Sequence, residues 1–250
     1  MRVLVACECS GVVRRAFRAR GHDAWSCDLC FAEDMGEHIR GDVLDVLGDG
    51  WDLMIAHPPC TYLASSGLHW NKRRRGRDAE TEKALAFVKT LLDAPIERIA
   101  VENPIGCIST RIRPPDQTIQ PWMFGENASK ATCLWLKGLD PLKHGEVVPP
   151  NRWRLVKCAA DLPVCECCGE EAWCPEHEMH FADCECVGPT QDDAKYKTIN
   201  GYLFGSKSAP HPVWANQTPS GQNKVGGPNQ SRIRAATYSG IAAAMAEQWG

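Results

Sequence analysis

The sequence lacks any long apolar run. After Met1 and Arg2 only five apolar residues lead to Cys7, which is too short for the hydrophobic region of a secretory signal. No stretch approaches the length that a membrane-spanning helix needs. We therefore expect a cytoplasmic protein with reduced thiols and no membrane partner.

Lysine and arginine are absent from residues 158–194, a stretch that holds ten acidic residues and seven of the 14 cysteines. The whole chain of 250 residues carries 28 basic and 31 acidic side chains, so the remainder has 28 basic against 21 acidic and a net charge of +7. A chain of this length, 44% hydrophobic, can bury a sizeable core without disulfides. The composition shift predicts a separate acidic module within a basic protein.

Short apolar runs alternate with helix-period segments in the first 145 residues, a pattern typical of βαβ units. In one predicted helix Val13, Phe17 and Arg20 share a face, and in another, capped by Asp78, Leu85, Val88 and Leu92 do. The fold class expected is α/β, Rossmann-like, with a wound and mostly parallel sheet. The predicted strands are 2–6, 23–28, 51–57, 96–101 and 133–136, and the predicted helices are 12–20, 79–93 and 241–249.

Polar residues follow several predicted strands, where a wound parallel sheet binds its ligands. The first strand ends in the turn Cys7–Gly11, whose backbone NH groups are expected to face a ligand. Asp28 and Asp42 are carboxylates suited to a nucleoside-like cofactor, although either alone is as readily a solvated turn residue. The pattern G-x-G-x-x-G is missing, which disfavours NAD and FAD.

A further strand end carries His57-Pro58-Pro59-Cys60. The two prolines fix the backbone, and a cysteine so placed can act as a nucleophile if nearby positive charge favours its thiolate. Five cations between Lys72 and Arg77 follow, and Glu102 ends the next strand. The alternatives are a buried cysteine and a merely solvated charge run.

The order of these motifs resembles the DNA cytosine-5 methyltransferases, particularly the short ones found in phages. The resemblance covers about residues 1–145 and the last twenty residues. It implies a Rossmann-like S-adenosylmethionine-dependent methyltransferase fold, double-stranded DNA as the partner, and a bacterial or phage-infected host cell as the location.

The resemblance also implies the roles of individual residues. Cys60 attacks C6 of a flipped cytosine while Glu102 hydrogen-bonds N3, and Lys130 stands as the single cation of a further motif. Asp28 binds the ribose and Asp42 lies near the adenine. The remaining cofactor-binding residues implied are Cys9, Ser10, Gly11, Val43 and Pro58.

The acidic module has the cysteine and histidine spacing by which loops present ligands to structural zinc. Up to nine candidates allow one or two ions; Cys165, Cys168, Cys174 and His177 are the first choice. The metal ligands predicted are Cys165, Cys168, Cys174, His177, His180, Cys184 and Cys186.

Three functions remain open from the sequence. The first is cytosine-5 methylation, the second is methylation of an exocyclic amine of cytosine or adenine, and the third is non-catalytic DNA binding by a zinc-containing protein on a methyltransferase scaffold. The oligomeric state, a monomer or small oligomer, is not determined. The expected organisation is a catalytic core in 1–145, a zinc-binding insert and candidate target-recognition region in 146–230, and a returning helix in 231–250.

Overall fold

The chain forms two compact units in its computed structural model. The first contains residues 1–126, 130–146 and 231–250, and the second contains residues 127–129 and 147–230. The structure describes residues 1–71, 73–145, 147–148, 152–154, 196–199, 202–205, 211–217 and 237–250.

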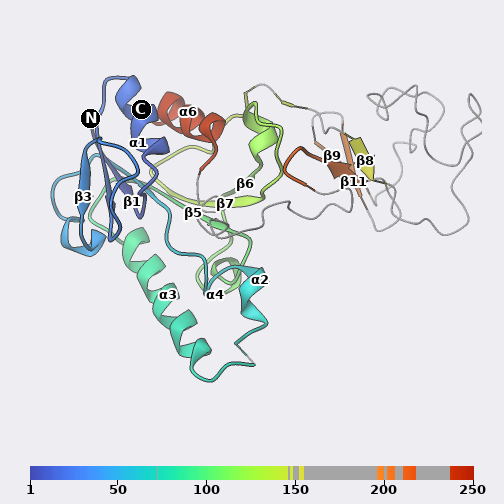
Figure 1. The fold of residues 1–250 in the computed structure, drawn as a ribbon, viewed down its shortest axis with the longest axis horizontal. Helices are drawn as coiled ribbons and strands as arrows, with labels where there is room; N and C mark the ends of the chain where they lie inside the picture. The colour runs from blue at the N-terminus through green and yellow to red at the C-terminus, as the bar shows by residue number, and fades with distance from the viewer. Residues whose placement is uncertain are drawn as a thin grey trace, which may run out of the picture. The chain divides into compact units, whose positions relative to one another are not determined.

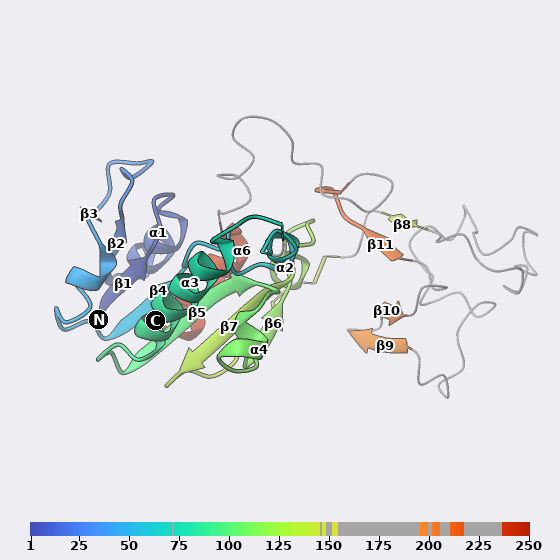
Figure 2. The same cartoon turned by 90° about the horizontal axis from the view of Figure 1, so that it is seen from below.

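A seven-stranded sheet forms the centre of the first unit, in the order β3-β2-β1-β4-β5-β7-β6 (Figure 2). The pairs from β3 to β5 are parallel, and β7 runs antiparallel to both of its neighbours. This wound sheet with an antiparallel β7 confirms the predicted S-adenosylmethionine-dependent methyltransferase fold. The strands are β1 (Arg2–Ala6), β2 (Asp23–Asp28), β3 (His38–Arg40), β4 (Leu53–Ala56), β5 (Arg98–Pro104), β6 (Gln117–Ile119) and β7 (Thr132–Lys137).

Helices cover both faces of this sheet (Figure 1). On one face α3 (Arg77–Leu92) buries Leu85 and Val88 against β4 and β5. On the other, α1 (Val12–Ala19) and α6 (Ser239–Gln248) pack together, with Phe17 and Met245 fully buried. Because both faces are covered, the central strands are apolar throughout rather than alternating.

Shorter elements connect the strands on this framework. They are η1 (Val43–Asp45), α2 (Ser65–Leu68), α4 (Ile108–Arg111) and η2 (Pro121–Phe124).

Three sequence predictions about the helices were wrong in detail. Helix α3 begins after Gly76, at φ 79°, so Asp78 lies in its first turn rather than at its cap. Arg20 is exposed, whereas Arg14 of the same helix is buried. Leu91, rather than Leu92, completes the buried face of α3 because the face drifts with the 3.6-residue period.

The second unit contains two short antiparallel strand pairs among its described residues. Strand β8 (Arg152–Arg154) pairs with β11 (His211–Val213), and β9 (Tyr196–Ile199) pairs with β10 (Tyr202–Gly205). In the part of the chain that the structure describes, no helix is both long and apolar enough to cross a membrane.

Candidate active site at the carboxyl edge of the sheet

The carboxyl ends of four neighbouring strands meet at one edge of the sheet. Cys7 follows β1, Asp28 ends β2, His57 follows β4, and Glu102 lies near the end of β5. The His57 backbone NH donates to the Ala6 carbonyl at 2.9 Å, and that of Cys7 donates to the Cys27 carbonyl at 2.7 Å. The edge therefore forms a continuous row of polar side chains.

Two carboxylates lie close to Cys7 at one end of this row. Burial, followed by the charges of Asp28, Cys27 and Asp42, raises the pKa of the Cys7 thiol to about 12. Asp28 and Asp42 thus both raise the pKa of the Cys7 thiol, although they lie 14 residues apart in the sequence. Each also accepts a local backbone bond, from Cys30 at 2.8 Å and from Leu44 at 3.0 Å.

The turn after β1 leads into α1, whose first NH groups are already paired, while a ligand contact by the NH groups of the turn Cys7–Gly11 stays a prediction. Gly11 adopts φ 68°, but the NH groups of Val13 and Arg14 already donate to the carboxylate of Glu8, at 2.8 and 3.3 Å. These NH groups therefore do not face a ligand. Glu8 is 5% exposed, and its negative charge lies where a phosphate would otherwise bind the helix terminus.

The other predicted cofactor residues lie around this turn, with different exposure. Ser10 Oγ donates to Glu8 at 3.1 Å, and the Cys9 carbonyl accepts from the Glu33 NH at 2.8 Å. Val43 is 4% exposed and packs in the core. A direct cofactor contact by the Val43 side chain is accordingly not supported by its position.

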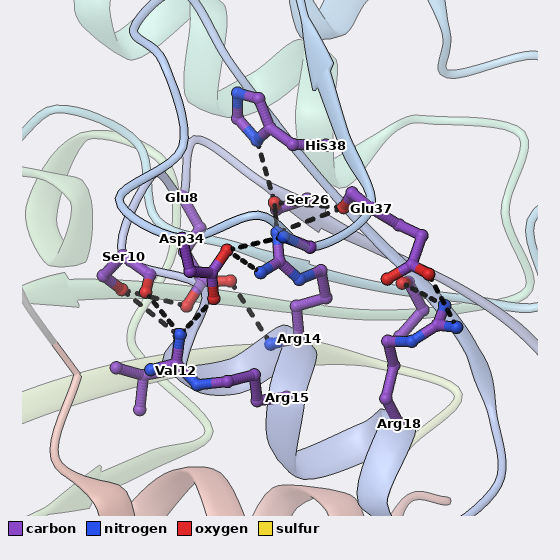
Figure 3. Close-up of polar contacts among 12 residues, drawn as sticks. Glu8, Ser10, Val12, Arg14, Arg15, Arg18, Ser26, Asp34, Glu37 and His38 are labelled. Carbon is purple, nitrogen blue, oxygen red and sulfur yellow. Dashed lines mark hydrogen bonds and ion pairs between the residues drawn. The ribbon is translucent and has the colours of Figure 1, made fainter.

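A network centred on Arg14 holds the loop between β2 and β3 against α1 (Figure 3). The Arg14 side chain is 1% exposed; it pairs with Asp34 and donates to Ser26 Oγ at 2.9 Å. Asp34 pairs with Arg15 as well. Burial raises the pKa of Asp34, but hydrogen bonds from Arg14, Gly36 and Arg15 outweigh burial and bring the pKa down to about 2.

Cys60 lies in a loop that begins with a buried proline. The amide of Asn103 donates to the Pro58 carbonyl at 2.8 Å, which ties the start of this loop to the end of β5. The Cys60 carbonyl accepts from Leu63 and Ala64 at 3.0 and 2.9 Å, while its thiol is free and half-buried. The backbone at Cys60 is thus fixed on both sides.

The same loop is joined to the segment after β5. The Ser65 NH donates to the Ile105 carbonyl and the Cys107 NH donates to the Leu63 carbonyl, both at 2.9 Å. Between them, Gly106 approaches so closely that an added Cβ would lie 2.0 Å from the Leu63 carbonyl oxygen. The loops that carry Cys60 and follow Glu102 therefore form one backbone unit.

Glu102 and His57 form a buried pair within this edge. His57 Nδ1 lies 3.0 Å from Glu102 Oε2, and the two side chains are 9% and 10% exposed. Burial raises the pKa of Glu102, yet the His57 hydrogen bond and charge, the charge of Lys130 and the Thr132 hydroxyl together lower it below its ordinary value. Lys130 is therefore close enough to act electrostatically on Glu102.

The cation run after Cys60 has two roles in the structure. Arg77 is half-buried; it donates to the Thr61 carbonyl at 2.9 Å and stacks on Tyr62, so it supports the Cys60 loop. Arg73 and Arg74 are exposed and stack on Trp70. Arg77 is therefore not merely solvated, whereas Lys72 lies outside the described residues.

The predicted zinc ligands lie outside the described residues. Among the residues that the structure describes, no group of three or more histidine, cysteine or acidic side chains could hold a metal ion. The zinc assignment stays a prediction from spacing. Its residues are Cys165, Cys168, Cys174, His177, His180, Cys184 and Cys186.

Sequence reasoning assigned no role to His57 or Glu8. The position of His57 directly after a buried strand is the same signal that pointed to Asp28, so it was available in the sequence. The capping role of Glu8 had no such signal. Glu8 accepts a hydrogen bond from the NH of Val13, five residues later, and this spacing matches no ordinary cap pattern.

Comparisons with known proteins give only distant structural similarity. A scan against protein-family models and a search of curated proteins find no match. The chain is similar to one described as a DNA modification methyltransferase encoded within an E. coli prophage: TM-score 0.35, 12% identity, covering 66% of this chain and 62% of that one.

The chain is also similar to an rRNA methylase from Escherichia coli, with TM-score 0.33, 17% identity, 54% of this chain and 56% of that one. In both cases less than two thirds of the solved chain is covered. These values assign no substrate to the chain.

Proposed function

We propose that this protein is an S-adenosylmethionine-dependent DNA cytosine-5 methyltransferase in which Cys60 is the nucleophile. One observation carries the proposal: a free cysteine and a buried glutamate stand on adjacent strand ends whose loops are joined through Asn103 and Gly106. Methylation at C5 requires this combination, because cytosine C5 is a poor nucleophile until a thiolate adds at C6 and N3 is protonated.

The residues at the Cys7 end of the edge fit such a cofactor. Asp28 and Asp42 offer carboxylate oxygens to hydroxyl and amine donors, and both act on Cys7. Glu8 places negative charge at the start of α1, which disfavours a cofactor bound there through phosphates. S-adenosylmethionine supplies a methyl group on a positively charged sulfur, and it carries no phosphate.

The chain's own groups account for the remaining steps. The Cys60 thiolate forms a bond to C6, the C5–C6 π electrons move toward N3, and N3 takes a proton through Glu102. The resulting enamine makes C5 nucleophilic toward the methyl group. Solvent water takes the C5 proton, the electrons of the C5–H bond form the C5–C6 double bond, and the Cys60 thiolate leaves C6. N3 then returns its proton, and the ring regains aromaticity.

A duplex substrate fits the exposed part of the cation run. Arg73, Arg74 and Arg75 are exposed between α2 and α3, on the segment that continues from the Cys60 loop. Guanidinium groups of this kind bind phosphates, and the target base has to leave the stack to reach Cys60.

The decisive experiment uses duplex DNA that contains 5-fluorocytosine, from which the C5 substituent cannot leave as a proton. With S-adenosylmethionine we expect a covalent protein–DNA adduct that survives denaturing electrophoresis. Cys60→Ala should abolish the adduct, whereas Cys30→Ser, which alters an exposed free thiol, should retain it.

The same experiment separates the competing chemistries. Methyl transfer by Cys60→Ala to an amine of cytosine or adenine would contradict the proposal and favour amine methylation. DNA binding by the wild-type protein without any transfer would instead favour a non-catalytic binding protein.

A further inference from the structure

His57 is a buried titratable side chain to which the methyltransferase resemblance assigns no role. Its ring is 9% exposed, Nδ1 is 3.0 Å from Glu102, and Nε2 is buried with no hydrogen-bond partner in the described part of the chain. A buried nitrogen without a partner costs free energy unless a ligand or function uses it. The backbone that carries the ring is also held in place, since the His57 backbone NH extends the β1–β4 ladder to the Ala6 carbonyl.

The pair holds one exchangeable proton between two basic sites. Nε2 keeps its own proton in both forms: either Nδ1 of the imidazolium carries the shared proton and donates to the carboxylate, or Glu102 carries it and donates to Nδ1 of the neutral ring. With a contact of 3.0 Å between two side chains that are 9% and 10% exposed, the proton can move between the two atoms with little reorganisation of the site.

Other groups around Glu102 favour its ionised form. Lys130, which precedes β7, lowers the pKa of Glu102, and the Thr132 hydroxyl does the same. Cys133 of β7 interacts with Glu102 electrostatically, and the segment that follows His57 carries Cys60 and Tyr62. The His57 hydrogen bond is the largest of the influences that lower the pKa of Glu102, so in the resting pair the shared proton is favoured on Nδ1 rather than on Glu102.

We propose that His57 is a positioning residue that supplies, through Glu102, the proton that N3 of the target cytosine takes up. This inference rests on the proposed function. As the Cys60–C6 bond forms, the proton passes from Nδ1 to Glu102 and from Glu102 to N3. When C5 loses its proton and Cys60 leaves, N3 returns the proton along the same path, so the pair ends the cycle unchanged.

The test compares His57→Asn with Thr132→Val in the full chain. Asparagine can keep an NH near the position of Nδ1 but cannot titrate, whereas Thr132→Val removes a different hydrogen bond from Glu102 and leaves the shared proton. Single-turnover transfer of a labelled methyl group to duplex DNA is measured from pH 5 to pH 10, together with S-adenosylmethionine binding and thermal unfolding.

We expect His57→Asn to slow transfer by about 10²-fold while cofactor binding changes little. The limb on which the rate falls with rising pH should move to lower pH, because a carboxyl group alone loses its proton at lower pH than an imidazole does. Thr132→Val should reduce the rate without that acidward shift. If His57→Asn does not fold, His57→Gln serves with the same expected shift.

An unchanged pH limb and a rate within twofold of wild type in His57→Asn would overturn this inference and leave the proposed function standing. An equal acidward shift in Thr132→Val would also overturn it, since any disturbance of Glu102 would then suffice. Absence of both transfer and adduct in the wild-type protein would overturn the proposed function and the inference together.

Discussion

Arg14 and Glu102 are ionisable side chains buried inside the first unit, and each contacts a partner from another element. Arg14 on α1 pairs with Asp34 from the β2–β3 loop, and Glu102 on β5 pairs with His57 after β4. An unpaired charge at such a site would cost several kcal/mol, so each pair depends on both of its members.

The Asp34 ion pairs should make stability depend on acid. Because the folded pKa, about 2, lies below the ordinary value of 3.8, the unfolded chain binds the proton more readily. The stabilisation is complete above about pH 4 and is lost as the pH falls toward 2. We expect Asp34→Asn to remove at most about 2 kcal/mol at neutral pH, as measured by urea unfolding.

A surface pair provides the matched control for Asp34→Asn. Glu80 and Lys83 form an exposed pair on α3, and Glu80→Gln should leave the free energy of unfolding nearly unchanged. Equal losses in the two variants would show that the β2–β3 loop is not held by buried charge. A loss in Asp34→Asn that persists unchanged at pH 2 would contradict the linkage.

At the scale of elements, the long buried strands were predictable and the short polar ones were not. Strands β1, β4 and β7 are runs of apolar residues buried on both faces, which a sequence shows directly. Strands β3 and β6 have three residues each, with mixed exposure. They form because β2 and β7 each offer a free edge for pairing, and the residues of β3 and β6 alone do not predict a strand.

In the site, likewise, the sequence predicts where the functional residues lie but not which residues they contact. The places of Cys60, Asp28 and Glu102 follow from rules about strand ends. Their partners do not, because His57 and Glu102 are 45 residues apart and come together only through the β4–β5 pairing. Likewise the start of α1 is occupied by Glu8, which the Ser10–Gly11 turn alone does not reveal.

Gly106 provides a test of the joined loops. In Gly106→Ala the new methyl group would meet the Leu63 carbonyl at 2.0 Å, so the backbone of one loop has to move. Misplacement of a catalytic group by about 1 Å costs about 10²-fold in rate. We expect transfer to fall by at least about 10-fold, measured under single-turnover conditions, with cofactor binding retained.

Gly48→Ala is the control for this prediction. No atom lies within 4 Å of a Cβ built at Gly48, which is not in the left-handed region. Full activity in Gly106→Ala would show that Cys60 does not depend on the Gly106 contact.

At the scale of the whole molecule, the net charge of −3 is the sum of an acidic stretch and a basic remainder. Residues 158–194 contribute ten acidic side chains and no basic ones, and the remaining residues carry +7. Phosphate contacts are therefore expected from the basic part of the chain. The acidic stretch is expected to bind metal, since its seven cysteines and two histidines are soft ligands.

Metal analysis of the intact chain tests this expectation. We expect one or two zinc ions per chain after extensive dialysis, with Cys165→Ser and Cys168→Ser each lowering the stoichiometry and Cys30→Ser leaving it unchanged. Removal of the metal should destabilise the chain, because zinc binding contributes directly to folding at structural sites. A zinc-free and fully active wild-type protein would refute the ligand assignment.

Helix α6 is at the C-terminal end of the chain, so the hydrophobic core that it covers can be completed only late in synthesis. Its Met245 and Ala246 complete the cluster around Phe17 of α1, and Arg98 donates to the Trp249 carbonyl at 3.1 Å. Residues 147–230 must be translated before α6 emerges, which takes about 4 to 17 s at ordinary rates of synthesis. During that interval the apolar side of α1 and its sheet face lack their cover, so the nascent chain offers a temporary binding surface to chaperones.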